Sequence, residues 1–147
     1  MTSFIEESAW PESFTNGENR ELLEKFYNLS NAPNPGSDAS EEALAELFDP
    51  EKGVYQLASK KAQGREAIIE LRKALFASIP RREHRVVKIF TFGEDQSQLL
   101  VLGKVEYGHH HGHETNSDWA SKIVLSTSEG QPKLAEVQII VDTATHI

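Results

Sequence analysis

The sequence predicts an α+β fold in which a curved, mostly antiparallel sheet wraps around three N-terminal helices and leaves a central cavity. The last helical pattern opens at Gly64 and stops at Ile79-Pro80, and four strand-like runs then fill residues 84–142. The joints between these runs are short and turn-like. Long strands with short connections favour an antiparallel, strongly twisted sheet. Helices in front of such a sheet must pack on one of its faces, which predicts a pocket between the two layers.

Composition predicts a single globular domain over residues 15–147, preceded by an irregular arm over 1–14. The chain has 147 residues, 38% of them apolar and 26% charged, and no cysteine. The lack of cysteine excludes disulfide and thiol chemistry. No run of the sequence approaches the roughly 18 apolar residues of a membrane span. The first fifteen residues carry no basic segment of the signal-peptide type. We therefore expect a cytoplasmic protein without a membrane partner.

Charge argues against nucleic acid as a partner. The net charge is −8. Residues 1–50 hold eleven acids and two bases, a net of −9, and residues 51–147 hold twelve acids and thirteen bases, a net of +1. Nucleic-acid binding normally needs a basic face that neutralises phosphates.

The N-terminal elements can be placed in order. Phe4, Trp10 and Phe14 are candidate anchors of the arm, over the pocket or on a second subunit. Capping-box spacing over residues 15–18 predicts a helix that is capped by Thr15. This helix carries an apolar stripe and ends before the Pro- and Gly-rich residues 31–36.

The later elements follow the same logic. Ser40 or Asp38 is expected to cap a second helix that Asp49-Pro50 closes, and residues 54–58 form a short strand. The third helix is expected to bury a stripe of Ile68, Leu71, Leu75 and Ile79, with Ile69 and Phe76 beside it. The remaining strands are expected at 84–92, 98–108, 117–127 and 134–142.

These features resemble a known family. The element order, the Gly-Arg-Glu-Ala-Ile start at residues 64–68 and a last strand ending Ile-Val-Asp at 140–142 resemble the SnoaL-like branch of the nuclear-transport-factor-2-like superfamily. Residues 79–90 and 118–120 resemble an uncharacterised fungal group within it. The resemblance spans about residues 15–142 and implies a cone-like barrel around a mostly apolar cavity. The fungal pattern usually has aromatics in the final strand, where this chain has isoleucine at 139 and 140.

The resemblance implies a class of function. Relatives include polyketide cyclases, steroid isomerases, scytalone dehydratase and fungal isomerases of secondary metabolism, most of which need no cofactor. It therefore implies a cofactor-independent isomerase, dehydratase or cyclase that moves protons on a small hydrophobic metabolite. The alternative is a non-catalytic ligand-binding or dimeric interaction module. A homodimer is expected, because the superfamily often dimerises and a broad sheet must cover its outer face.

Two residues are candidates for proton transfer. His84 begins the strand after the third helix, a region where the resemblance places the catalytic histidine of scytalone dehydratase. Asp118 is the second candidate. Strand alternation puts Asp118 and Lys122 on one face and Trp119 on the other, and only one face can line the cavity. Either Asp118 and Lys122 lie inside as a pair, or Trp119 is a lining aromatic.

Tyr27 and Tyr55 are candidate ligand-binding residues. Their hydroxyls could orient a substrate carbonyl, and the alternative is that both are ordinary core aromatics.

The histidine run over residues 108–114 suggests metal chemistry at first sight. If Gly112-His113 forms a two-residue hairpin loop, then His109, His111 and Glu114 share a face. The run nevertheless lies at the tip of a hairpin, where polar residues are solvated, and no second layer of partners is evident. We therefore expect an exposed tip and assign no metal.

Overall fold

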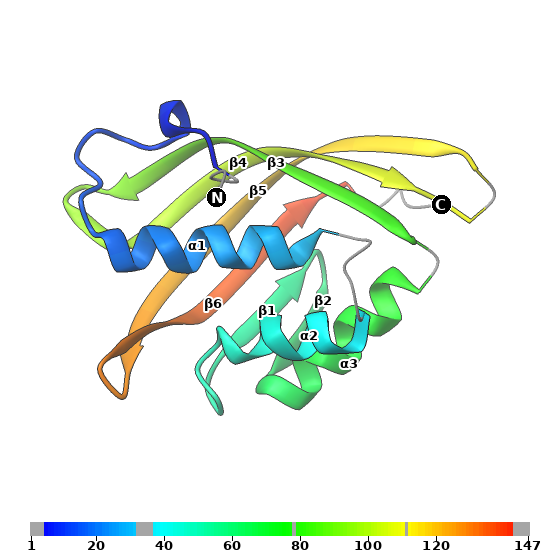
Figure 1. Cartoon of the computed structure of the whole chain (residues 1–147), viewed down its shortest axis with the longest axis horizontal. Coiled ribbons are helices and arrows are strands. Elements are labelled where there is room, and N and C mark those ends of the chain that lie inside the picture. The colour runs from blue at the N-terminus through cyan, green and yellow to red at the C-terminus, as the bar shows by residue number, and fades with distance from the viewer. Residues whose placement is uncertain (1–4, 32–36, 78, 111, 143–147) are drawn as a thin grey trace.

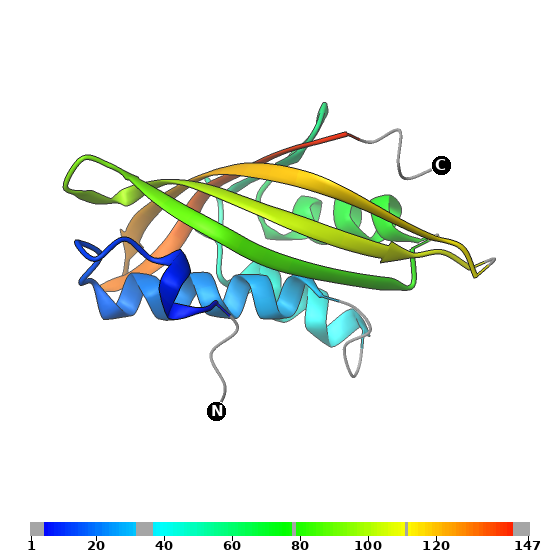
Figure 2. The ribbon, with the colours of Figure 1, turned by 90° about the horizontal axis from the view of Figure 1, so that it is seen from above.

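Three helices lie against the inner face of a curved six-stranded sheet (Figures 1 and 2). The computed structural model describes residues 5–31, 37–77, 79–110 and 112–142, so Phe4 lies outside it. The elements are η1 (Glu7–Ala9), α1 (Gly17–Ser30), α2 (Ser37–Glu46), β1 (Val54–Leu57), β2 (Lys60–Gln63), α3 (Arg65–Phe76), β3 (Arg81–Phe92), β4 (Asp95–Gly108), β5 (Glu114–Ser128) and β6 (Gln131–Val141). No helix in these ranges is long and apolar enough to cross a membrane.

The sheet order is β2-β1-β6-β5-β4-β3, and the sheet is unclosed. All neighbours are antiparallel except β1 and β6, which run parallel. The predicted fold class, a curved and mostly antiparallel sheet wrapped around helices, is confirmed. Strand β2 is the element that the pattern missed: it buries only Ala62 among polar neighbours, so it has no apolar alternation to detect.

Alternation along the long strands separates an inner from an outer face. In β4 the buried positions include Val101, Gly103, Val105 and Tyr107, and the residues between them are exposed. Irregularities in the pairing register between Val86 and Lys88 and between Val124 and Leu125 accompany the bending of the sheet. The inner face therefore forms a concave wall that the helices cover.

Two predicted helix starts are wrong in detail. The cap of α1 is Asn16, whose side chain accepts a hydrogen bond from the backbone N–H of Asn19. The backbone N–H of Thr15 instead donates to Gln96 Oε1 over 2.9 Å. Helix α2 begins at Ser37, so Ser40 lies inside the helix rather than at its cap. The side chain of Asp38 lies outside the described residues.

The buried stripe of α3 also differs from the prediction. Ile68, Arg72 and Phe76 are buried, whereas Leu71 and Leu75 are only partly buried. The buried face of α3 is therefore rotated relative to the predicted one, and Arg72 lies at its centre. The arginine side chain points toward the interior, where it forms the polar end of the site described below.

The N-terminal arm docks on its own chain. Trp10 and Phe14 are buried, with ring centroids 4.8 Å apart. The Arg20 guanidinium lies 4.5 Å from the Trp10 ring centroid and forms a 2.6 Å ion pair with Glu7. The described part of the arm therefore packs near the start of α1, and none of its residues lines the cavity described below.

Candidate functional site

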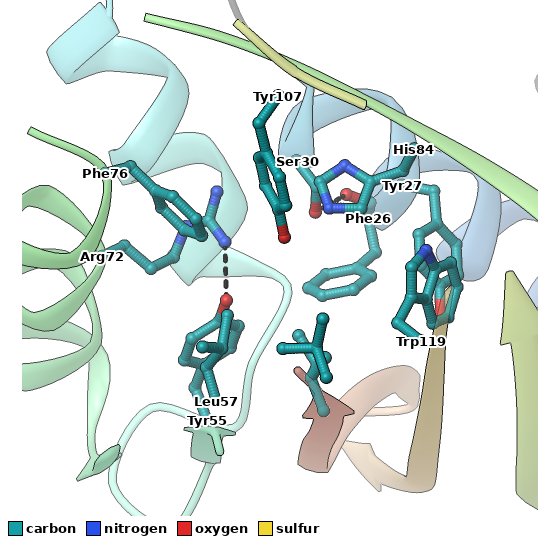
Figure 3. A pocket seen from close by; sticks show the side chains of 12 residues that line it. Phe26, Tyr27, Ser30, Tyr55, Leu57, Arg72, Phe76, His84, Tyr107 and Trp119 are labelled. Atoms are coloured by element: carbon teal, nitrogen blue, oxygen red, sulfur yellow. Dashed lines mark hydrogen bonds between the residues drawn. The ribbon is translucent and has the colours of Figure 1, made fainter. Parts of the chain in front are cut away.

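A narrow cavity lies between α1, α3 and the inner face of the sheet (Figure 3). The centre of a water molecule can occupy about 20 Å³ of it, which is room for about one water. Its walls are mainly aromatic and aliphatic. They comprise Phe26, Tyr27, Ser30, Tyr55, Leu57, Arg72, Phe76, His84, Tyr107, Trp119, Ile139 and Val141.

His84 is held by a single amide. Its backbone N–H donates to Asn31 Oδ1 over 2.7 Å, and its ring Nδ1 lies 2.9 Å from the same oxygen. An amide oxygen only accepts hydrogen bonds, so Nδ1 must carry the proton and Nε2 must carry the lone pair. Burial, and then the charges of Arg72 and Arg82, lower the pKa of His84 to about 3. The ring is therefore a neutral hydrogen-bond acceptor at physiological pH.

Arg72 and Tyr55 form the polar end of the cavity. Arg72 is 2% exposed and contacts both oxygens of Glu41, with Nε to Oε2 at 2.6 Å and Nη2 to Oε1 at 3.3 Å. Its Nη1 donates to the Tyr55 hydroxyl over 3.0 Å (Figure 3). Since the Tyr55 oxygen accepts this bond, its own proton is available to a ligand.

A second guanidinium lies behind this end. Arg82 Nη2 is 3.8 Å from Glu41 Oε1, and its Cζ lies 4.1 Å from the centroid of the Phe76 ring. Burial and the neighbouring charge of Arg72 lower the pKa of Arg82 to about 10, so both arginines are cations at neutral pH. Among the described residues, Glu41 is the one carboxylate ion-paired with either arginine.

The opposite wall is aromatic. The rings of Tyr27 and Trp119 are stacked with centroids 5.4 Å apart, and the Trp119 ring lies edge-on to His84 at 6.2 Å. Within the described part of the chain, the buried hydroxyls of Tyr27 and Ser121 have no hydrogen-bond partner. The Ser121 hydroxyl is nonetheless close enough to affect Tyr27, whose pKa burial raises strongly. Gly103 leaves space for Trp119, since a Cβ there would lie 2.2 Å from the indole ring.

Asp118 does not reach this site. Its side chain is 81% exposed on the outer face of β5 and pairs with Lys104 over 2.9 Å. Lys122 also points outward, toward Glu136. Of the two alternatives for this strand, the structure selects the one in which Trp119 lines the cavity, and the alternative with Asp118 inside is wrong.

The histidine run also forms a different hairpin from the expected one. Gly108 pairs with Glu114 and Tyr107 with Thr115, and the backbone N–H of His109 donates to the carbonyl of His113. Glu114 forms a 2.7 Å ion pair with Arg81 on β3 instead of joining a ligand set. In the parts of the chain described, no cluster of three potential metal-binding side chains occurs. His111 lies outside those parts.

The structure thus brings four predicted residues together, His84, Tyr27, Tyr55 and Trp119, and adds residues that sequence reasoning missed. Arg72 follows Ile68 by four positions and precedes Phe76 by four, so helical spacing alone could have placed it on the buried stripe. Its charge hid it, because an isolated arginine is normally assigned to the surface. Its partner Glu41 lies in another helix and gives no local signal.

The curved sheet and the helices packed inside it define the α+β cone fold of NTF2-like proteins. No protein-family model matches the sequence, and no curated protein matches it. Solved structures do. An NTF2-like protein of unknown function from Exiguobacterium sp. 255-15 superposes with a TM-score of 0.64 at 18% identity, covering 82% of this chain and 98% of that one.

Two further structures are similar. A protein assigned as a SnoaL-like polyketide cyclase from Jannaschia sp. CCS1 has a TM-score of 0.66 at 15% identity and covers 86% of this chain and 87% of its own. A hypothetical protein with a ketosteroid isomerase-like fold from Catenulispora acidiphila, in complex with trimethylamine, has a TM-score of 0.67 at 15% identity, with coverage of 85% and 88%. At such identities the likeness establishes the fold and leaves function to the site.

Proposed function

We propose that this chain binds a compact, hydrophobic small molecule in the cavity, whose walls move apart to admit a ligand larger than the single water it can hold when empty. It catalyses a cofactor-independent isomerisation, dehydration or cyclisation of this molecule. One observation carries the proposal: an imidazole with a fixed tautomer lines an otherwise largely apolar cavity that also holds a tyrosine hydroxyl with a free proton. His84 Nε2 would accept a proton from the substrate, and Tyr55 would donate a hydrogen bond to a carbonyl oxygen.

The environment favours this division of roles. Arg72 donates to the Tyr55 oxygen, which makes the Tyr55 proton a better donor toward negative charge that develops on a substrate oxygen. Trp119 and Tyr27 supply a flat apolar surface for the rest of the molecule. The solved relatives support this class of function, since they include one assigned as a polyketide cyclase and one bound to trimethylamine.

A non-catalytic ligand-binding module of the same fold is the second candidate. Two observations favour it: no carboxylate is among the cavity-lining residues described, and a pKa of about 3 makes free His84 a weak base. The two candidates share the same binding site and differ only in whether a proton is transferred.

Deuterium exchange separates them. Cyclohex-3-en-1-one, a small β,γ-unsaturated ketone, is incubated with the protein in D₂O and followed by NMR. Catalysed loss of its acidic C–H signals or conversion to the conjugated ketone supports the enzyme, and His84→Ala should abolish it while leaving the fold intact. His113→Ala, at the exposed hairpin tip, is the matched control. Saturable binding without exchange in the wild type would instead establish the binding module.

We also propose that the chain forms a homodimer through the outer face of the sheet. Apolar side chains continue across four strands there: Phe90 pairs with Leu100, Leu102 pairs with Ala120, and Ala120 pairs with Ile140. Ala120 is half-buried and the other four are exposed. A contiguous apolar patch on a sheet marks an interaction surface.

A second copy fits this face by charge as well. The ion pairs Lys104–Asp118 and Lys122–Glu136 lie beside the patch on the same face, so a two-fold axis can set acids of one copy against lysines of the other. A cytoplasmic location and membership of the fungal SnoaL-like group complete the proposal. They rest on the lack of cysteine and on the motif at residues 79–90.

A further inference from the structure

The polar end of the cavity contains more positive than negative charge. Arg72 and Arg82 are 2% and 6% exposed, and both contact Glu41, which is the single carboxylate paired with them in the described residues. Arg82 also reaches the carbonyl oxygens of Ser30 and Ile79, each at 3.4 Å. These neutral acceptors solvate the cation without cancelling its charge, so the cluster keeps a net charge of +1 in a largely buried position.

This charge bears directly on the cavity. Arg72 and Phe76 both line it, and the centroid of the Phe76 ring lies 5.2 Å from the Arg72 Cζ and 4.1 Å from the Arg82 Cζ. The charges of both arginines also act on His84, on the other side of the cavity. A buried charge without a full counter-charge is unfavourable, and an anion bound in the cavity would relieve it.

We propose that the molecule this cavity selects carries one anionic oxygen group, a carboxylate or an enolate, and that the group binds at the Tyr55–Arg72 end. This inference rests on the proposed function, because it takes the same cavity as the binding site and adds the charge of the ligand. The Tyr55 hydroxyl donates to the anionic oxygen. The positive charges of Arg72, which lines the cavity, and of Arg82, which packs on the lining residue Phe76, stabilise it. The hydrophobic remainder lies against Trp119 and Tyr27.

The test compares molecules that differ only in charge. Acetate is paired with acetamide, and cyclohexanecarboxylate with cyclohexanecarboxamide, all of which are transparent where tryptophan is excited. The chain has two tryptophans, so Trp10→Phe leaves Trp119 as the single fluorescent reporter in the cavity wall. Isothermal titration calorimetry of the wild-type protein with the same molecules checks that Trp10→Phe binds them with the same affinity as the wild type.

Arg82→Gln is the informative variant. Glutamine can still donate to the carbonyl oxygens of Ser30 or Ile79, and the Arg72–Glu41 pair stays intact and neutral. Arg81→Gln is the matched control, since it removes the same charge from the adjacent, partly exposed position that pairs with Glu114. We expect the carboxylate to bind at least about tenfold more tightly than its amide, which corresponds to about 1.4 kcal/mol. The ratio should fall toward one in Arg82→Gln and persist in Arg81→Gln.

A second measurement needs no variant. In wild-type protein, bound carboxylate should raise the pKa of His84 seen by NMR, and the bound amide should not. Equal binding of acid and amide, or an unchanged ratio in folded Arg82→Gln, would overturn the anionic preference while leaving the cavity as a binding site. Failure of every probe to bind would overturn both the preference and the proposed small-molecule function.

Discussion

His84 should make the stability of this protein depend on pH in a specific direction. The imidazole has an ordinary pKa of 6.5 in the unfolded chain and about 3 in the folded one. Between these values the unfolded state binds more protons, so the free energy of unfolding rises with pH. The contribution of His84 is complete above pH 6.5 and is lost progressively as the pH falls toward 3.

The size of the effect follows from the two pKa values. From pH 7 to pH 5, a shift of this size removes about 2 kcal/mol of stability from one group, at a limiting slope of about 1.36 kcal/mol per pH unit. The side chain is only partly shielded from solvent, and screening reduces the figure, so we expect about 1–2 kcal/mol.

Urea unfolding at pH 7 and pH 5, followed by circular dichroism, measures this loss. Other groups titrate in the same range, so the quantity of interest is the difference between wild type and His84→Gln, in which those groups are retained. The variant should lose about 1–2 kcal/mol less than the wild type over this interval. Equal losses in the two proteins, or an NMR titration of His84 with a midpoint near 6.5, would refute the reasoning.

Three further outcomes are expected. Gly103→Ala should lower the free energy of unfolding in urea by about 1–3 kcal/mol, because the new Cβ would overlap the Trp119 indole. Gly17→Ala is the control and should be tolerated, since a Cβ there would have nothing within 4 Å. Equal effects of the two substitutions would exclude a packing cause. Glu41→Gln should destabilise the protein by about 3 kcal/mol in the same assay, because it leaves two buried guanidiniums without a counter-charge. Glu42→Gln, at the adjacent exposed position, is the control and should change the free energy of unfolding by no more than about 0.5 kcal/mol. Ile140→Lys should convert the proposed dimer to a monomer in sedimentation velocity at unchanged thermal stability, and a wild-type protein that is already monomeric would disprove the dimer.

Local patterns in the sequence were sufficient to predict the order of the helices and the long strands. Alternation in the long strands and the stop at Ile79-Pro80 place the helices before the sheet, as the structure shows. They were insufficient for strand β2, whose polar edge position leaves no apolar period. The start of α1 moved by one residue because Asn16 and Thr15 are both good caps, and the distant Gln96 decides between them.

The site was predictable only in part, for a related reason. His84 could be proposed from its place at the start of a strand and from the family resemblance. For β5, alternation separates Asp118 from Trp119 but could not tell which face is inside. The choice between Asp118 and Trp119 depends on Gly103 in the neighbouring strand, where the absence of a side chain makes room for the indole. The Arg72–Glu41 contact joins two helices across 31 residues, and no local pattern reports such a pair.

The buried hydroxyl of Tyr27, a residue of the cavity wall, has a practical consequence for finding the natural ligand. A buried hydroxyl without a partner costs about 1–3 kcal/mol, so the empty protein is less stable than its packing would allow. A molecule that satisfies such a hydroxyl, and binds only the folded chain, raises the melting temperature in proportion to its occupancy. Thermal-shift screening of metabolite extracts would therefore rank fractions by how well they complete this cavity, before any reaction is known.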